Sequence, residues 1–289
     1  MIALRRLPRT VSRILLKAGR KLVVWNRTAA KAEALKAEAP EQVTVVATPA
    51  AVLAACELSY VMLSTPDVVK TVYEMENGIL AGVVAGKKVV DCATLAVEDM
   101  VRLNGQVTSK GGRFLEAPVS GSKGPAANGQ LIFLCGGDEA LYAECAADLD
   151  AMGKAKFFFG AVGAGTKIKL CVNMTMGSLM CAFSEGFSLC ASSGMDSAKL
   201  LEVLGLGVCG CPLLSLKGAK MLAGDHAPNF PLQHAEKDMR LAVGLAASSG
   251  LALPLASAGQ QAMKRAMDDD GLGEQDFSSV FESVKKQKC

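Results

Sequence analysis

Short apolar segments alternate with amphipathic segments along the first half of the chain. Val, Ile, Leu and Phe dominate brief runs at 21–25, 42–47, 58–64, 87–92, 113–117 and 131–135. Amphipathic stretches follow the first four runs, for example at 29–37 and 97–109. Strands that alternate with helices predict βαβ units and a parallel sheet covered on both faces. Such an open sheet binds ligands at the carboxyl ends of its strands.

The second half has a helical pattern throughout. One long apolar run at 166–195 contains a single acid, Glu185. A helix that is apolar on nearly all sides is expected to be buried, often between domains or subunits. Further helices are predicted at 197–206, 212–222, 232–248, 255–267 and 277–286. We therefore predict an α/β domain over 1–162 and an all-α domain over 163–289, joined by the long helix.

The N-terminal segment has two interpretations. Residues 1–32 contain no acid and include Arg5, Arg6, Arg9 and Arg13, which is typical of an organellar transit peptide. The alternative is a basic first helix of the fold, and the composition is compatible with both. The expected compartment is therefore cytoplasmic or organellar, in a plastid or mitochondrion.

Composition excludes several classes of protein. With 51% hydrophobic and 20% charged residues, the chain is neither disordered nor fibrous. Its net charge of +3 is spread along the sequence, so no nucleic-acid partner is expected. Two histidines are too few for a histidine-based metal site, and no metal is predicted. The uncharged run at 241–263 is broken at 248–250 and at Pro254, which favours two packed helices over a membrane span.

The ten cysteines form no Cys-x-x-Cys pair. Four of them sit in apolar runs, where cysteine usually behaves as a small buried hydrophobe: Cys135, Cys171, Cys181 and Cys190. Buried reduced thiols are favoured over a metal or disulfide role, which implies a reducing compartment.

The segment after the 21–25 run carries a candidate phosphate clamp. In a dinucleotide-binding sheet the second strand ends beside the adenosine ribose. An acid there selects NAD, whereas an arginine holds the 2′-phosphate of NADP. Asn26 and Arg27 stand at this point, and no acid follows before Glu33. Arg27 is the candidate clamp and Thr28 the N-cap of the next helix; the alternative is a surface arginine at a strand end.

The segment 116–125 reads Glu-Ala-Pro-Val-Ser-Gly-Ser-Lys-Gly-Pro. Small residues after a strand let a ligand approach backbone N–H groups, which form a concave anion site. Ser120 and Ser122 add hydroxyl donors for a carboxylate. The alternative is an ordinary Gly/Pro/Ser connection.

Two polar residues share a face at the start of the long helix. Lys169 and Asn173 are four residues apart, and burying a lysine is costly unless it serves a purpose. Partial burial and cationic neighbours bring a lysine amine into the range that suits a general acid. The alternative is a lysine that snorkels to solvent, and Lys167 is expected to face solvent.

The last motif is His-Ala-Glu-Lys-Asp-Met-Arg-Leu-Ala at 234–242. Lys237 lies among alternating charges, and this pattern by itself indicates a solvated helix face.

In this order, four segments closely resemble the β-hydroxyacid dehydrogenase (3-hydroxyisobutyrate dehydrogenase-like) family, and within it the glyoxylate/succinic semialdehyde reductase branch. They are Trp-Asn-Arg-Thr, Pro-Val-Ser-Gly-Ser, Gly-x-Gly-x-x-x-Lys-x-x-x-Asn and Lys-Asp-Met-Arg-Leu-Ala. The resemblance extends from 14 to 284. It implies a Rossmann-type NADP-binding domain, a helical substrate and oligomerisation domain, and assembly as a homodimer or homotetramer.

The resemblance also implies an activity and roles. The activity is NADPH-dependent reduction of glyoxylate to glycolate, or of succinic semialdehyde to 4-hydroxybutyrate. Lys169 would protonate the carbonyl oxygen and Asn173 would orient the substrate. The substrate carboxylate would bind Ser120, Gly121 and Ser122. Cofactor contacts would fall on Asn26, Arg27, Thr28, Ser64, Thr65, Pro66, Thr94 and Lys237.

One segment departs from this family. The family begins with a strand and a Gly-x-Gly-x-x-Gly turn whose amides cradle the pyrophosphate, but here the first glycine is Gly19 and Pro8 lacks an amide donor. The first strand and the glycine loop are therefore expected to be missing, with neighbouring strands underpaired. A different first exon is the working hypothesis. The competing functional hypothesis is a dehydrogenase-like binding or assembly module with impaired catalysis.

Overall fold

The chain divides into two compact units, Met1–Lys169 and Leu170–Cys289. The structure is a computed structural model, which describes residues 2–3 and 6–287. The boundary between the units falls inside the long helix α10 (Ala164–Ser192). The predicted boundary at 162/163 lies just before this helix begins. Each unit has its own hydrophobic core, so each is described separately.

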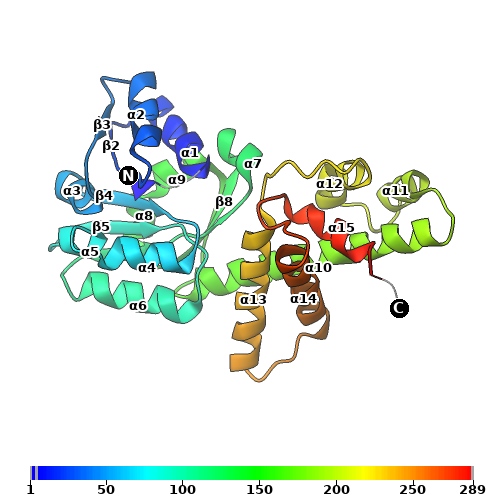
Figure 1. Cartoon of the computed structure of the whole chain (residues 1–289). Helices are drawn as coiled ribbons and strands as arrows, with labels where there is room; N and C mark the ends of the chain where they lie inside the picture. The colour runs from blue at the N-terminus through cyan, green and yellow to red at the C-terminus, as the bar shows by residue number, and fades with distance from the viewer. Residues whose placement is uncertain (1, 4–5, 288–289) are drawn as a thin grey trace. The chain divides into compact units, whose positions relative to one another are not determined.

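A seven-stranded sheet forms the centre of the first unit (Figure 1). Its strand order is β1 (Ile2–Ala3), β4 (Leu58–Met62), β5 (Lys88–Asp91), β6 (Arg113–Glu116), β8 (Leu131–Gly137) and β7 (Val119–Ser120), and β9 (Gly153–Phe158) pairs with β8. The strands from β1 to β6 are parallel, as predicted, but β8 is antiparallel to both β6 and β7. The ten residues at 121–130 that join β7 to β8 are too few for a parallel crossover.

The first strand was expected to be missing, but the structure contains a very short one. Strand β1 pairs with β4 over two residues. Among the described residues, β2 (Leu22–Val24) and β3 (Val43–Val45) form a separate two-stranded sheet, so the predicted underpairing is present. The segment expected to carry the glycine turn includes Leu4 and Arg5, which lie outside the described residues.

A basic helix follows β1. Helix α1 (Arg6–Lys17) buries Val11, Leu15 and Leu16 in the core, and Pro8 falls in its first turn, where proline is tolerated. Gly19 ends the helix with a φ of +79°, a conformation that glycine adopts at little cost. Residues 6–17 therefore form a helix that packs into the core of the first unit.

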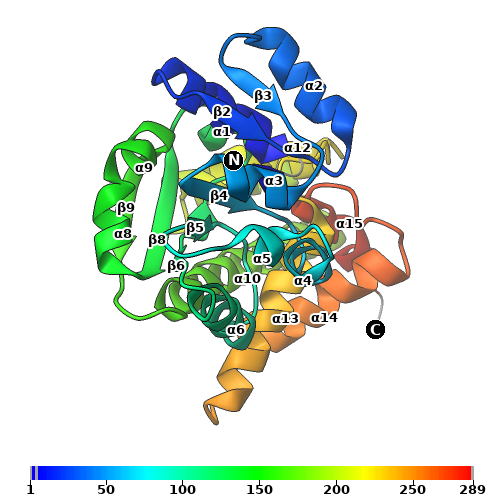
Figure 2. The same ribbon diagram turned by 90° about the vertical axis from the view of Figure 1, so that its left-hand side faces the viewer.

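Helices cover both faces of the sheet because side chains alternate along its strands. In β4, Tyr60 and Met62 pack into one core cluster, and Val61 with the following Leu63 into the other. The first cluster is covered by α1, α2 (Ala29–Glu38), α7 (Lys123–Ala127), α8 (Glu139–Glu144) and α9 (Ala146–Met152). The second is covered by α3 (Pro49–Ala55), α4 (Pro66–Glu74), α5 (Ile79–Gly82) and α6 (Val97–Thr108), of which α4, α5 and α6 lie along one side of the sheet in Figures 1 and 2.

The second unit is helical, as predicted. It contains α11 (Ser197–Leu206), α12 (Pro212–Leu222), α13 (Leu232–Ser248), α14 (Pro254–Asp268), the 3-10 turn η1 (Phe277–Ser279) and α15 (Val280–Val284). Its core is built from Phe187, Met239, Met263 and Phe277 among others. No described helix is long and apolar enough to cross a membrane.

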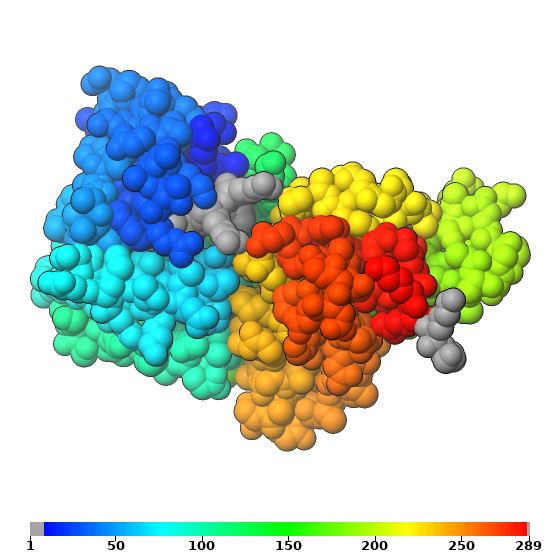
Figure 3. Space-filling model, viewed as in Figure 1, coloured from blue at the N-terminus to red at the C-terminus, as the bar shows by residue number. Residues whose placement is uncertain are grey.

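Parts of the second unit are more exposed than the sequence predicted. Helix α11 buries none of its residues, and Leu206 at its end is 92% exposed. Figure 3 shows this yellow-green segment at the surface. On α10, Leu189 is 68% exposed, so the prediction of burial on nearly all sides is wrong for this chain alone. Cys171 is exposed as well, because it lies on this outer side of α10. The nine described cysteines are all free, and Cys289 lies outside the described residues.

Candidate functional site

The carboxyl ends of β4 and β5 bring the first group of predicted residues to one edge of the sheet. The two strands are parallel, with Val61 opposite Asp91. Ser64, Thr65 and Pro66 follow β4 and Thr94 follows β5, and all four are half-buried. Thr65 is the N-cap of α4, but its hydroxyl forms no cap hydrogen bond. These side chains therefore line the edge where an open α/β sheet binds ligands.

The end of β2 presents the predicted phosphate clamp. Arg27 is exposed, and the side chain of the half-buried Asn26 accepts a hydrogen bond from the backbone N–H of Thr28, with an Oδ1 to N distance of 2.9 Å. Thr28 is the N-cap of α2, as predicted, although its hydroxyl makes no cap bond. The exposed guanidinium is thus in a position to bind an anion from solvent.

The predicted carboxylate-binding turn follows β6. Ser120 is the last residue of β7 and is half-buried, and Ser122 is the N-cap of α7. Gly121 between them has a φ of +132°, and a Cβ there would approach Leu131 Cδ2 to 2.9 Å. This conformation and close approach explain why a glycine stands in the Ser-Gly-Ser segment. The structure thus explains the glycine, and the binding of a carboxylate by this turn stays a prediction.

Lys169 is buried at the start of α10. Only 6% of its surface is exposed, so it does not extend into solvent as the snorkelling alternative predicted. Lys167, two residues earlier, is exposed, as predicted.

Sequence reasoning missed the residue that holds the start of this helix, Glu116. Its carboxylate is fully buried and accepts hydrogen bonds from the backbone N–H groups of Gly163 and Gly165 and from the Thr166 hydroxyl. Burial raises the pKa of Glu116, whereas the hydrogen bonds from Thr166 and the two amides act in the opposite direction. The only signal in the sequence was an acid at the end of an apolar strand.

A second missed residue, Asp91, lies at the end of β5. Asp91 is fully buried, accepts a 2.7 Å hydrogen bond from the Tyr73 hydroxyl and a 2.8 Å bond from the backbone N–H of Ala93. The second bond shapes the turn that leads to Thr94. Burial raises the pKa of Asp91 to about 6, although both hydrogen bonds lower it.

This raised pKa predicts a pH-dependent stability. Between the ordinary value of 3.8 and the folded value of about 6, the folded state binds the proton more tightly than the unfolded state. Stability therefore falls as pH rises through this window, by about 3 kcal/mol in total. Asp91→Asn cannot ionise, so its free energy of unfolding, measured relative to wild type in urea, should gain about that amount between pH 3.5 and pH 7.

Asp138→Asn serves as a control of opposite sign. The hydrogen bonds from Arg113 lower the pKa of Asp138, so this variant should lose stability relative to wild type as pH rises. A difference between Asp91→Asn and wild type that does not change with pH would contradict the assignment.

The last two predicted residues, Asn173 and Lys237, belong to the second unit, where both contact the carboxylate of Asp238. Asn173 Nδ2 donates to Asp238 Oδ2 at 2.5 Å, and Lys237 Nζ lies 2.9 Å from Asp238 Oδ1. Lys237 and Asp238 are 6% and 3% exposed. The solvated helix face indicated by the charge pattern is therefore wrong, because α13 turns these charges inward.

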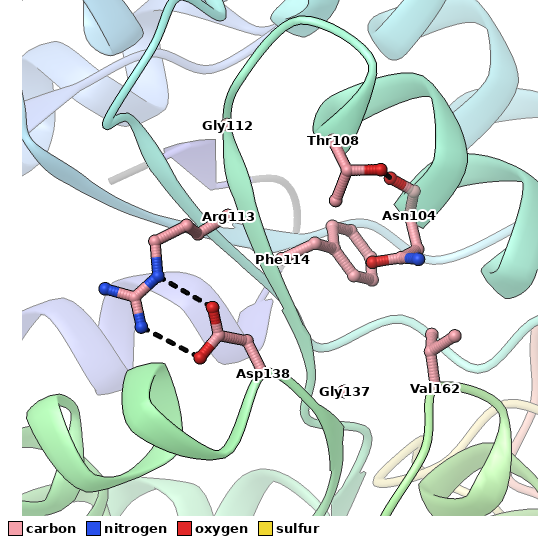
Figure 4. Close-up of a pocket in the computed structure, with 8 residues that line it drawn as sticks. All are labelled: Asn104, Thr108, Gly112, Arg113, Phe114, Gly137, Asp138 and Val162. Atoms are coloured by element: carbon pink, nitrogen blue, oxygen red, sulfur yellow. Dashed lines mark hydrogen bonds and ion pairs between the residues drawn. The ribbon is translucent and has the colours of Figure 1, made fainter.

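A pocket of about 450 Å³ opens elsewhere on the first unit, beside Arg113 and Phe114 at the beginning of β6. Asp138 in its wall accepts two hydrogen bonds from the Arg113 guanidinium (Figure 4). The pocket contains none of the predicted site residues, and its charged groups already pair with each other. We therefore assign the candidate site to the carboxyl edge of the sheet. Among the described residues, no cluster of His, Cys, Asp or Glu is arranged to hold a metal ion.

An open α/β unit with polar residues at its strand ends, followed by a helical unit, is an arrangement typical of nucleotide-dependent dehydrogenases. Comparisons with known proteins agree. Residues 9–172 match the model of the NAD-binding domain of 6-phosphogluconate dehydrogenase. Residues 163–284 match the NAD-binding model of NADP-dependent 3-hydroxyisobutyrate dehydrogenase.

Individual relatives are more specific than the family models. The chain is 43% identical to glyoxylate/succinic semialdehyde reductase 1 of Arabidopsis thaliana, over 96% of this chain and 94% of the relative. It is also 43% identical to the chloroplastic reductase 2 of that plant, over 95% of this chain and 75% of the relative. The cytokine-like nuclear factor N-PAC of Gallus gallus is 37% identical over 92% of this chain, which spans about half (48%) of N-PAC.

Among solved structures, Mycobacterium tuberculosis 3-hydroxyisobutyrate dehydrogenase with L-serine superposes with a TM-score of 0.86. That similarity covers 98% of this chain and 97% of the other, at 26% identity. The chain therefore belongs to the β-hydroxyacid dehydrogenase family, in agreement with the resemblance of its motifs. It is an NADP-dependent oxidoreductase that acts on CH–OH or aldehyde groups.

Proposed function

We propose that this chain uses NADPH to reduce small aldehydes that carry a carboxylate, glyoxylate or succinic semialdehyde, and that Lys169 is the proton donor. The observation that carries the proposal is the burial of Lys169. Lys169 lies one turn beyond Thr166, and the Thr166 hydroxyl donates a hydrogen bond to Glu116 at the end of β6. The turn at Ser120 emerges from the same strand end. An ammonium and a carboxylate-binding turn on one edge of the sheet match a substrate with a carbonyl near a carboxylate.

Each residue has a specific task in this reaction. The Ser120 and Ser122 hydroxyls and the backbone at Gly121 hold the substrate carboxylate and so orient the carbonyl. Lys169 donates a proton from Nζ to the carbonyl oxygen as negative charge develops there. Asn173 orients the substrate, and Asp238 holds the Asn173 amide and the Lys237 ammonium in place.

The residues at the strand ends fit NADPH, which supplies the hydride when bound. Arg27, Asn26 and Thr28 would bind its 2′-phosphate, since an exposed guanidinium recognises phosphate well. Ser64, Thr65, Pro66 and Thr94 would line the cofactor along β4 and β5, and Lys237 would contact it from α13. The pyrophosphate is the exception, because no glycine precedes Gly19 to form an amide cradle.

The lack of an amide cradle for the pyrophosphate favours one competing function, a dehydrogenase-like binding or assembly module with impaired catalysis. The chain is also similar to N-PAC, which is named as a cytokine-like nuclear factor and not as a reductase. Against it, Lys169, Asn173, Ser120 and Lys237 are all present in this chain.

NADPH oxidation by the purified chain, assayed with glyoxylate and with succinic semialdehyde, tests the proposal. A second variant, whose first 13 residues are replaced by a strand and a Gly-x-Gly-x-x-Gly turn, is assayed in parallel. Turnover with either aldehyde supports the reductase. If neither protein turns over an aldehyde and NADPH binds only at millimolar concentration, the binding module is the better description.

We also propose that the chain works as a homo-oligomer. Val203 and Leu206 of α11 are 65% and 92% exposed in the single chain, and Leu189 of α10 is 68% exposed. Large exposed apolar patches are typical of subunit interfaces. A second copy is the occupant that fits, because a helix without buried residues such as α11 depends on packing for stability. Sedimentation at equilibrium should therefore give a multiple of 30.0 kDa.

A further inference from the structure

Glu116 contacts the first turn of α10 through both of its carboxylate oxygens. Oε1 accepts hydrogen bonds from the backbone N–H groups of Gly163 and Gly165, at 2.7 and 2.8 Å. Oε2 accepts one from the Thr166 hydroxyl at 2.6 Å. The N–H groups at a helix start have no partner within the helix, and a negative charge there is favourable because of the helix dipole.

The space around this carboxylate is closed by glycines. A Cβ at Gly136 would lie 2.6 Å from Glu116 Oε1, and a Cβ at Gly165 would lie 2.2 Å from the carbonyl oxygen of Leu134. Gly163 has a φ of +95°, which side chains rarely adopt. The two glycines of the Gly-x-Gly-x-x-x-Lys segment therefore allow α10 to begin directly against the carboxylate and β8.

Glu116 also occupies a special place along the chain. It is the last residue of β6, and the turn at Ser120 begins four residues later. The carboxylate of Glu116 binds Thr166 on α10. Lys169 follows Thr166 by three residues, about 4.5 Å along the helix axis. One side chain thus connects the strand that leads to the carboxylate-binding turn with the helix that carries the proposed proton donor.

We propose that Glu116 is a positioning residue that sets the distance between Nζ of Lys169 and the substrate-binding turn at Ser120. The proposal rests on the proposed function, because it requires Lys169 to act on a substrate held at that turn. Glu116 does not touch the substrate. Its length, rather than its charge, determines where the first turn of α10 lies.

Two substitutions separate length from charge. Glu116→Asp keeps the charge but shortens the side chain by one methylene, so the carboxylate cannot reach Gly163, Gly165 and Thr166 together. Glu116→Gln keeps the length; its amide oxygen can still accept from the two glycines and its amide nitrogen can donate to the Thr166 hydroxyl. Circular dichroism and thermal unfolding of both variants establish that they are folded.

The first measurement is amide hydrogen exchange over 163–169, which does not depend on activity. Glu116→Asp should exchange at least tenfold faster there than wild type, and Glu116→Gln should resemble wild type. The second measurement is turnover. Displacement of a catalytic group by about 1 Å costs up to 10²-fold, so kcat of Glu116→Asp should fall about 10–100-fold while the NADPH dissociation constant stays within twofold. Its solvent deuterium isotope effect on kcat should rise, because proton transfer from the displaced amine becomes slower.

Three results would overturn the inference that Glu116 positions Lys169. Equal exchange in Glu116→Asp and wild type overturns the inference, and so does faster exchange with an unchanged kcat. A larger loss in Glu116→Gln than in Glu116→Asp overturns it in favour of a role for the charge. These three results leave the proposed function intact, whereas a wild-type chain without any turnover removes both.

Discussion

Replacing Lys169 by alanine is expected to lower kcat for aldehyde reduction by about 10²–10⁴-fold, the usual contribution of a general acid. In the proposed mechanism the substrate carboxylate binds at Ser120 and NADPH binds at the strand ends, and neither contact involves Lys169. KM for the aldehyde and the dissociation constant of NADPH should therefore change much less than kcat. Stopped-flow or steady-state oxidation of NADPH measures the effect.

Two control variants make this result specific. Lys167→Ala removes an exposed lysine from the same turn of α10 and should leave kcat within about twofold of wild type, as most exposed substitutions do. Lys169→Arg keeps a positive charge but cannot give up a proton near neutral pH, so it should be nearly as slow as Lys169→Ala. Turnover of Lys169→Ala close to that of wild type would remove Lys169 from the mechanism.

Replacing Asp238 by alanine should destabilise the second unit strongly. Asp238 is 3% exposed, and its two oxygens contact Asn173 and Lys237, both of which are buried. Removing one partner of a buried ion pair costs about 3–5 kcal/mol, because the other charge stays in a poorly solvated place. Urea unfolding followed by circular dichroism should show a loss of this order.

A double-mutant cycle tests the cause of the loss. Replacing Lys237 by methionine in addition to Asp238→Ala removes both charges and should recover part of the stability. Asp238→Asn keeps the shape of the side chain and an acceptor for Asn173, so it should lose less than Asp238→Ala. If the double variant is as unstable as the sum of the two single variants, the pair does not interact as the distances indicate.

The positions of the helices and parallel strands could be predicted from local sequence patterns. The predictions at 197–206, 212–222 and 232–248 coincide with the bounds of α11, α12 and α13. Their starts carry local signals: Asp196 caps α11 through the backbone N–H of Ala198, and Pro212 is the first residue of α12. The parallel order of β4, β5 and β6 followed in the same way from strands that alternate with helices.

The alternating charges at 236–240 show where such reasoning fails. The same pattern fits a solvated face and a buried ion pair, and only the folded structure shows that Lys237 and Asp238 are buried. Glu116 and Asp91 are similar, since an acid at the end of an apolar strand is compatible with solvent or with burial. Their roles depend on partners supplied by other elements.

Local patterns along the chain were sufficient to predict the two-part architecture, the helices and the parallel strands, because periodicity, capping and turn residues act over a few neighbouring positions. The tertiary structure decided which charges are buried and what holds them. Glu116 meets Gly163 across 47 residues and Asn173 meets Asp238 across 65. Such contacts arise only when the chain closes on itself, and no local pattern encodes them.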